Sequence, residues 1–284
     1  PKLTHNDLNN YYENIYRSKN SPMYIDFNSY FLDKHTSDFR SISQLLLGRQ
    51  YVSNKKEYSF LDIGPGPGFS LISAKKIFQN VKLSVIESNS HAKNFYKKFF
   101  KDLSIYKNLN EIKNEIDVIL MSHSLEHFDI NDMPALFQDM HNILADDGIV
   151  IIEIPHADLR NLSFLSKRLN DTPHLSFFSL DSLTKLVDKS KFNICFINTV
   201  GSLLPDTYSE EINEGKEQNL TSSRSGSNIY KIIKKIIKKI SNYFGFYGYL
   251  KKINVILNTT EEPYSNINFQ YGGNRESIRC VLKK

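Results

Sequence analysis

The sequence predicts an α/β fold in which a mostly parallel, doubly wound sheet is covered by helices. A short apolar run at 58–63 leads into three alternate glycines and then into an amphipathic segment, as a strand, a tight turn and a helix would. Further apolar runs at 81–87 and 117–121 are each followed by a helical pattern. Strands that alternate with helices in this way are typical of parallel sheets.

The composition limits the class of protein. The 284 residues are 40% hydrophobic, which is enough for one large α/β domain, and the net charge of +5 comes from lysines spread along the chain. This mild charge gives little support to nucleic-acid binding. Two cysteines, Cys195 and Cys280, can form neither a disulfide framework nor a cysteine-rich zinc site, so we expect a cytoplasmic protein. No apolar stretch reaches the roughly 20 residues that span a bilayer, and residues 1–5 begin no signal peptide, so we expect no stable membrane insertion.

The elements follow from periodicity and from capping residues. Apolar residues at helical spacing predict two N-terminal helices, the second at 28–47 and closed by Gly48. Later helices are expected at 70–79, 91–101, 134–144 and 180–189, and strands at 58–63, 81–87, 103–106, 117–121, 149–155, 192–200 and 276–282. Ser90 is the expected cap of the helix at 91–101, and Ser179 or Asp181 that of the helix at 180–189. A turn is expected at 146–148.

The glycine-rich turn after the first strand is a candidate small-molecule site. Glycine permits sharp turns and close approach to a ligand, and the following helix offers unpaired N–H groups. The dinucleotide fingerprint G-x-G-x-x-G requires a third glycine where Phe69 stands, which weakens a nicotinamide or flavin interpretation. Glu87 ends the second strand, 25 residues after Asp62, and an acid there can accept hydrogen bonds from both hydroxyls of a ribose.

Three segments carry a resemblance to a known family. The pattern of Phe60–Gly68 resembles the first motif of class I S-adenosylmethionine-dependent methyltransferases. The string Ser122–Phe128 resembles the loop after the fourth strand in small-molecule members, and Thr172–Phe178 resembles a box that opens the helix before the sixth strand. The resemblance implies a Rossmann-like, seven-stranded, mostly parallel sheet with an antiparallel last strand.

The resemblance also implies a cofactor and the residues that bind it. The cofactor is S-adenosyl-L-methionine, and the product is S-adenosyl-L-homocysteine. The turn and Asp62 are expected at its amino-acid end, Glu87 at its ribose and the segment 107–110 near its adenine. The expected cofactor-binding residues are Asp62, Gly64, Gly66, Gly68, Glu87, Ser88, Ser122 and Leu109.

Histidines are the candidate catalytic residues, because a hydroxyl acceptor benefits from a base whose pKa lies near 7. They are His123, His127, His156 and His174. Each is alternatively a structural hydrogen-bonding residue, and an acceptor oxygen that is already ionised would need no base. No metal is expected, since the spacing of His123, His127 and Asp129 is not diagnostic.

The expected reaction is methyl transfer to an oxygen of a small polar acceptor, including anionic ones. A sugar, a nucleotide-sugar, a phosphoramidate or a precursor of a bacterial capsule or other surface polysaccharide is the first choice. Nucleic acid is disfavoured as a partner, because the Asn-Pro-Pro-Tyr type of box is replaced by Ser122-His-Ser-Leu. The alternatives are a lipid or membrane-associated substrate and a catalytically silent cofactor-binding partner protein. The oligomeric state stays open.

The most individual feature is an insertion between the sixth and seventh strands. Its segment 229–240 places isoleucines on one helical stripe and lysines on the other. Such a helix can pack on the protein, lie on an anionic membrane or hold an acidic substrate. We therefore expect an N-terminal helical cap at 1–50, a cofactor-binding core at 51–200 and 271–284, and a substrate lid at 201–270.

Overall fold

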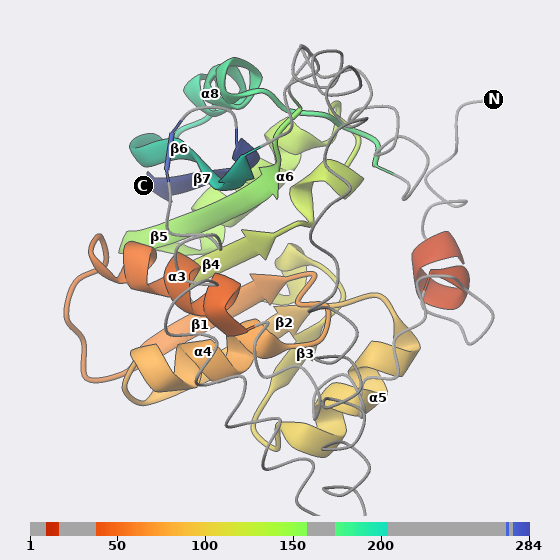
Figure 1. Cartoon of the computed structure of the whole chain (residues 1–284). Coiled ribbons are helices and arrows are strands. Elements are labelled where there is room, and N and C mark those ends of the chain that lie inside the picture. The colour runs from red at the N-terminus through yellow and green to blue at the C-terminus, as the bar shows by residue number, and fades with distance from the viewer. Residues whose placement is uncertain (1–9, 17–37, 158–173, 204–270, 273–274) are drawn as a thin grey trace, which may run out of the picture.

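A mixed sheet forms the centre of the computed structural model (Figure 1). The structure describes residues 10–16, 38–157, 174–203, 271–272 and 275–284. In these ranges the sheet has seven strands in the order β3-β2-β1-β4-β5-β7-β6. They are β1 (Tyr58–Ile63), β2 (Val81–Ile86), β3 (Ser104–Tyr106), β4 (Ile116–Ser122), β5 (Leu144–Pro155), β6 (Asn193–Leu203) and β7 (Arg275–Lys283). The first five strands are parallel, and β7 runs antiparallel to both β5 and β6. The expected fold class and the antiparallel last strand are confirmed.

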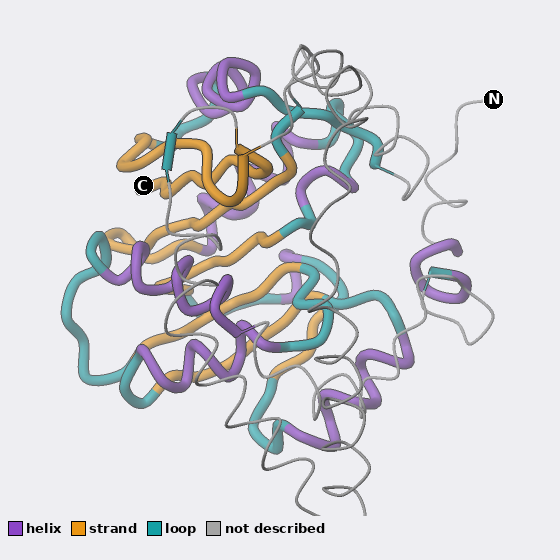
Figure 2. Tube along the Cα trace, in the orientation of Figure 1, coloured by secondary structure: helices purple, strands orange, loops and turns teal. Residues whose placement is uncertain are grey.

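Helices cover both faces of the sheet, as Figure 2 shows. The described helices are α3 (Asp38–Arg49), α4 (Phe69–Ile77), α5 (Ser90–Phe99), α6 (Met133–Ile143) and α8 (Leu180–Asp188), with three short helices, η1 (Tyr11–Ile15), η3 (Leu109–Glu111) and η4 (Leu125–His127). In Figure 1, α3 and α4 lie in front of the sheet, α6 lies behind it, and η1 lies apart from it beyond α5.

The core has two parts because successive strand residues point to opposite faces. Along β4, Val118 and Leu120 pack in the cluster that includes residues of α3, α4 and α5, whereas Ile119 and Met121 pack in the cluster with α6 and α8. Burial on both faces explains why the central strands read as continuous apolar runs. Gly48 permits α3 to approach β5, since a Cβ there would lie 2.4 Å from Ile151 Cδ1.

Two local predictions change, and one is confirmed. The cap of α5 is Asn89, whose side chain accepts a hydrogen bond from Ala92 N at 3.0 Å, and Ser90 is instead the first helical residue. The expected turn at 146–148 lies within β5 as an irregularity, because the register shifts there relative to β4. The cap of α8 is Ser179, as predicted, and it forms a capping box with Ser182.

Several predicted features fall outside the described residues. They include the first ten residues of the helix expected at 28–47, residues 204–270 of the expected lid with its Ile/Lys segment at 229–240, and the start of the box at 172–178. Among the described helices, none combines the length and the apolar character that crossing a membrane requires.

Candidate active site

The carboxyl ends of β1, β2 and β4 meet where the strand order reverses. β1 lies between β2 on one side and β4 on the other, so the connections from these strands diverge at this point. Ligands of open α/β sheets bind in the crevice at such a switch point. The turn after Ile63, the acid at Glu87 and the loop after Ser122 all start at this edge.

The turn after β1, residues 64–68, is a glycine-rich cradle in which two prolines alternate with the glycines. Gly64, Gly66 and Gly68 have φ angles of 77°, 56° and 79°, in the left-handed region that favours glycine. A Cβ on Gly64 would lie 3.1 Å from Ser124 Cβ, so the turn touches the loop after β4 directly. The Tyr96 hydroxyl donates a hydrogen bond to the Gly66 carbonyl and holds the turn from the side of α5.

Asp62 is the second-last residue of β1 and lies next to this cradle in the chain. Its side chain is buried, and Ser70 Oγ at the start of α4 donates a hydrogen bond to Oδ2. Oδ1 is buried and has no hydrogen-bond partner among the described residues. Burial raises the pKa of Asp62 from 3.8 to about 7, the Ser70 hydrogen bond opposes this rise, and the charge of Glu87 adds to it.

This burial predicts a stability change with pH in the cofactor-free protein. The folded state holds the Asp62 proton up to about pH 7, whereas the unfolded chain loses it near the ordinary value of 3.8. The contribution of the bound Asp62 proton to the folding stability is therefore complete below about pH 4, and it is lost as the pH rises through 7. Asp62→Asn removes this titration. Between pH 4 and 8, the free energy of unfolding of the variant should therefore rise by a few kcal/mol relative to that of the wild type. Urea unfolding across that range measures the difference, and parallel curves for the two proteins would contradict it.

Glu87 is fixed at the end of β2 by the start of α5. Its Oε1 accepts a hydrogen bond from the backbone N–H of Asn89 at 2.8 Å, and its side chain is partly exposed. Asn89 is buried, and its Nδ2 donates to the carbonyl of Tyr12 at 3.0 Å. The N-terminal helix η1 is thereby attached beside the acid. Ser88 lies between them with an exposed side chain.

Two further predicted cofactor residues have different surroundings. Ser122 ends β4, and its Oγ accepts a hydrogen bond from Gln44 Nε2 of α3 at 2.8 Å. Gln44 is fully buried, and its Oε1 has no hydrogen-bond partner among the described residues. Leu109 is 7% exposed and packs in the core beside Ile112, so its side chain contributes mainly to packing.

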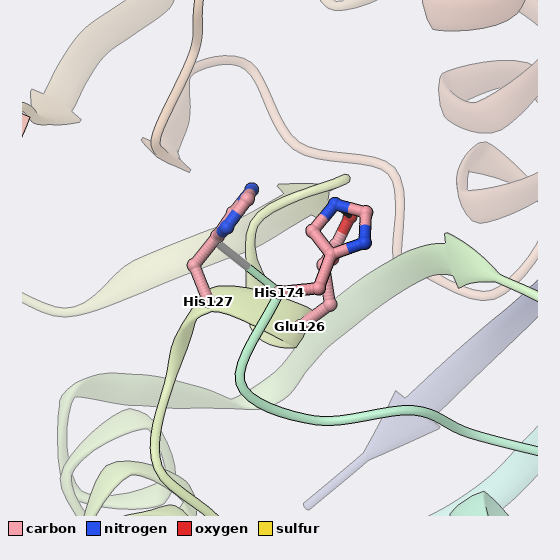
Figure 3. A group of neighbouring side chains, drawn as sticks. All are labelled: Glu126, His127 and His174. Carbon is pink, nitrogen blue, oxygen red and sulfur yellow. Dashed lines mark ion pairs between the residues drawn. The ribbon is translucent and has the colours of Figure 1, made fainter. Parts of the chain in front are cut away.

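Two of the predicted histidines meet beside the loop after β4. His127 ends η4, and His174 lies on the segment before α8, with ring centroids 5.0 Å apart (Figure 3). The Tyr12 hydroxyl lies 2.7 Å from His127 Nδ1, and burial raises the pKa of Tyr12, so this phenol stays protonated. Glu126 directly precedes His127 in the chain, and its carboxylate lies behind the His174 ring in Figure 3. Sequence reasoning missed Glu126 as a site residue.

His123 and His156 take other positions. His123 follows β4 with a φ of 53°, and its Nδ1 lies 3.6 Å from Glu126 Oε1, while its Nε2 lies 3.7 Å from Glu153 Oε1. Burial opposes the charged imidazole, but the two carboxylates outweigh it and raise the pKa of His123. His156 is 9% exposed, and its Nδ1 lies 2.9 Å from the carbonyl of Arg275, so it binds the start of β7.

A row of polar residues, buried at Glu153 and Arg279, crosses the sheet beneath α3. Ser122, Glu153, Arg279 and Asn198 are paired in register across β4, β5, β7 and β6. Arg279 Nε donates to Glu153 Oε2 at 2.6 Å, and Arg40 Nε of α3 lies 3.5 Å from Glu153 Oε1. Burial disfavours the Glu153 charge, yet Arg279, His123 and Arg40 hold its pKa well below the usual range. The charged residues Glu153 and Arg279, each inside an apolar run, were the signal for this row in the sequence.

The described residues fit the cofactor that the motifs imply. The turn has three glycines in the left-handed region, Asp62 Oδ1 has no hydrogen-bond partner among the described residues, and Glu87 directly follows the neighbouring strand. Ligand donors such as an ammonium group and ribose hydroxyls suit these acceptors. The fold and the site together define a class I S-adenosylmethionine-dependent methyltransferase.

The comparisons with known proteins agree. The chain belongs to the methyltransferase domain family, whose model matches residues 35–195, and its cofactor is S-adenosylmethionine. It is 25% identical over 227 residues to the ribosomal RNA small subunit methyltransferase G of Mycoplasma capricolum, an alignment that covers 74% of this chain and 91% of that protein.

Two solved structures share the fold. One is an S-adenosylmethionine-dependent methyltransferase from Archaeoglobus fulgidus, with a TM-score of 0.53 and 16% identity over 91% of this chain and 100% of the other. The second is the mycolic acid cyclopropane synthase CmaA1 in complex with S-adenosylhomocysteine, with a TM-score of 0.52 and 14% identity over 86% and 84% of the two chains.

Proposed function

We propose that this methyltransferase transfers a methyl group to an oxygen of a small polar acceptor. The observation that carries the proposal is the contact between the glycine cradle and the loop after β4. Ser124 lies against Gly64, and two residues later the chain reaches Glu126 and His127. An acceptor placed among these polar side chains would lie next to the methyl end of a cofactor seated on the cradle.

The protein's task in such a transfer is mainly alignment and exclusion of water. Bound S-adenosylmethionine supplies an electrophilic methyl group whose C–S electron pair stays on sulfur as the acceptor oxygen forms the new O–C bond. The hydroxyl proton of the acceptor leaves through the polar cluster to solvent. An oxygen that is already ionised has no proton to lose.

The charge distribution supports acceptors that carry a negative group. Arg40 is 43% exposed and lies on α3, close to the buried pair formed by Glu153 and Arg279. Although Arg40 Nε lies 3.5 Å from Glu153 Oε1, the exposed part of its guanidinium has donors for a further anion. Sugars, nucleotide-sugars and phosphoramidates of surface-polysaccharide synthesis combine hydroxyl and anionic groups, and we propose this class.

The direct test is a screen of acceptors by S-adenosylhomocysteine production. Nucleotide sugars, phosphorylated metabolites, lipid extracts and ribosomal RNA are each incubated with the full chain and labelled cofactor. We expect labelled product only with the small polar acceptors. Turnover of RNA or lipid alone would contradict the proposal, and cofactor binding without turnover of any acceptor would favour the silent partner protein.

Glu87→Ala tests the cofactor side of the site. Loss of a charge-assisted contact with the ribose should weaken S-adenosylmethionine binding by about 2 kcal/mol, which is roughly 30-fold in Kd. Isothermal titration calorimetry measures the affinity. Glu57→Ala is the matched control, because Glu57 is 54% exposed and pairs only with Lys82 among the described residues. Equal affinity of both variants would remove Glu87 from the cofactor site.

A further inference from the structure

Glu126 is a buried carboxylate that lacks hydrogen-bond donors within the described ranges. Its side chain is 2% exposed, and neither carboxylate oxygen has a hydrogen-bond partner among the described residues. Its backbone carbonyl accepts hydrogen bonds from Leu175 N at 2.9 Å and Ser176 N at 3.1 Å, so the segment before α8 is tied to it. A buried carboxylate in this state is costly unless a cation compensates it.

In the described part of the chain, the groups next to Glu126 that can carry a positive charge are imidazoles, which are charged only when protonated. His123 Nδ1 lies 3.6 Å and His174 Nε2 4.0 Å from Oε1, both beyond hydrogen-bond length. Arg40 and Arg279, the closest guanidinium groups along this edge, pair with Glu153. The carboxylate therefore lies beside imidazole nitrogen atoms, and a neutral imidazole nitrogen and the carboxylate could both bind the same metal ion.

Three ligand atoms converge at this point (Figure 3). Glu126, His127 and His174 each offer one ligand atom, and the three atoms lie within 4.8 Å of one another. Bonds from a metal to imidazole nitrogen or to carboxylate oxygen are about 2.0–2.2 Å long, so ligand atoms on one ion lie roughly 3–3.5 Å apart. Small rotations of the side chains would close the remaining gap.

The surroundings of the three side chains also suit ligation. The Tyr12 hydroxyl contacts His127 at Nδ1, and such an outer hydrogen bond orients an imidazole whose Nε2 binds a metal. The backbone bonds from Leu175 and Ser176 fix the distance between the two histidine-bearing segments. Two imidazoles and one carboxylate are a donor set for divalent first-row transition metals, with coordination positions left open for a further ligand.

We propose that Glu126, His127 and His174 bind one divalent transition-metal ion, whose open position takes an oxygen of the methyl acceptor. The acceptor role rests on the proposed function. A coordinated hydroxyl releases its proton to solvent, and the oxygen is then held beside the cradle for attack on the methyl group. A net positive charge of the ion and Glu126 together suits an anionic or hydroxyl oxygen.

The test uses the full chain after removal of metals with a chelator. Zn²⁺ is titrated in competition with a chromophoric chelator, and Co²⁺ absorption reports the coordination. We expect one equivalent to bind, with Kd weakened at least about 100-fold in each of Glu126→Gln, His127→Ala and His174→Ala. His91→Ala is the matched control, since His91 is an exposed histidine on α5, and it should bind like the wild type. S-adenosylmethionine affinity close to wild type shows that each variant is folded.

Three outcomes overturn the inference. They are the absence of stoichiometric binding, binding that survives all three substitutions, and metal-free protein that methylates its acceptor at the full rate. Failure of the wild type to bind S-adenosylmethionine would overturn the proposed function instead, and the metal titration would still report on the three ligands.

Discussion

Arg279→Met should destabilise the protein by about 3–5 kcal/mol, because it leaves the charge of Glu153 buried without its main partner. Arg279 is fully buried, and its Nε and Nη2 both lie 2.6 Å from Glu153 Oε2. Nη1 also donates to the Tyr271 hydroxyl at 3.2 Å, so the substitution removes a second contact. Urea unfolding followed by circular dichroism measures the change.

Two variants separate the buried charge from general damage to the sheet. Glu153→Gln combined with Arg279→Met should be less destabilised than the sum of the single variants, since neither charge remains buried. Lys82→Met removes the ion pair between Lys82 and Glu57, whose side chains are 72% and 54% exposed, respectively. This substitution should lower the free energy of unfolding by less than about 1 kcal/mol. A loss below about 1 kcal/mol in Arg279→Met would show that water or another cation already compensates Glu153.

His127→Gln is expected to lower turnover by about 100-fold or more while leaving S-adenosylmethionine affinity within about twofold. The reason is position: the ring lies against Tyr12 and His174 beside the loop that contacts Gly64, and not on the cradle itself. Single-turnover rates with an identified acceptor measure the first effect, and calorimetry measures the second.

His91→Gln provides the control for this prediction. His91 lies on α5 with an exposed side chain, so its replacement should change neither rate nor affinity. Equal turnover by His127→Gln and the wild type would place the acceptor elsewhere on the sheet edge. Tyr12→Phe tests whether the hydrogen bond between the Tyr12 hydroxyl and His127 Nδ1 contributes to turnover. We expect a smaller loss of turnover than in His127→Gln, because the imidazole of His127 is still present.

The glycine turn and the position of Glu87 beside it could be predicted from the sequence because they depend on local patterns. The glycines at 64, 66 and 68 immediately follow a strand, and the left-handed φ angles that they adopt explain why glycine stands there. Glu87 is separated from them by one helix and one strand, and parallel pairing of β1 with β2 brings both ends to the same edge. The regular alternation of strands and helices was therefore enough to predict that the glycine turn and Glu87 lie at the same edge of the sheet.

The positions of the four candidate histidines were predicted only in part. The sequence placed four histidines on the rim, and the structure gathers His127 and His174 beside Glu126, sets His123 between two carboxylates, and directs His156 to the start of β7. Ring positions depend on how loops pack, and the periodicity of strands and helices carries no information about that.

The sequence by itself determined the α/β fold, the order of its elements and the glycine cradle, because patterns of apolar residues and turn residues act over short stretches of chain. Only the tertiary structure decided which polar groups meet. Glu126 and His174 are 48 positions apart, Glu153 and Arg279 are 126 apart, and Tyr12 and His127 are 115 apart. Strand register and loop contacts bring these distant residues together. Because the charges are buried, the stability of each one depends on the partner that the fold places beside it.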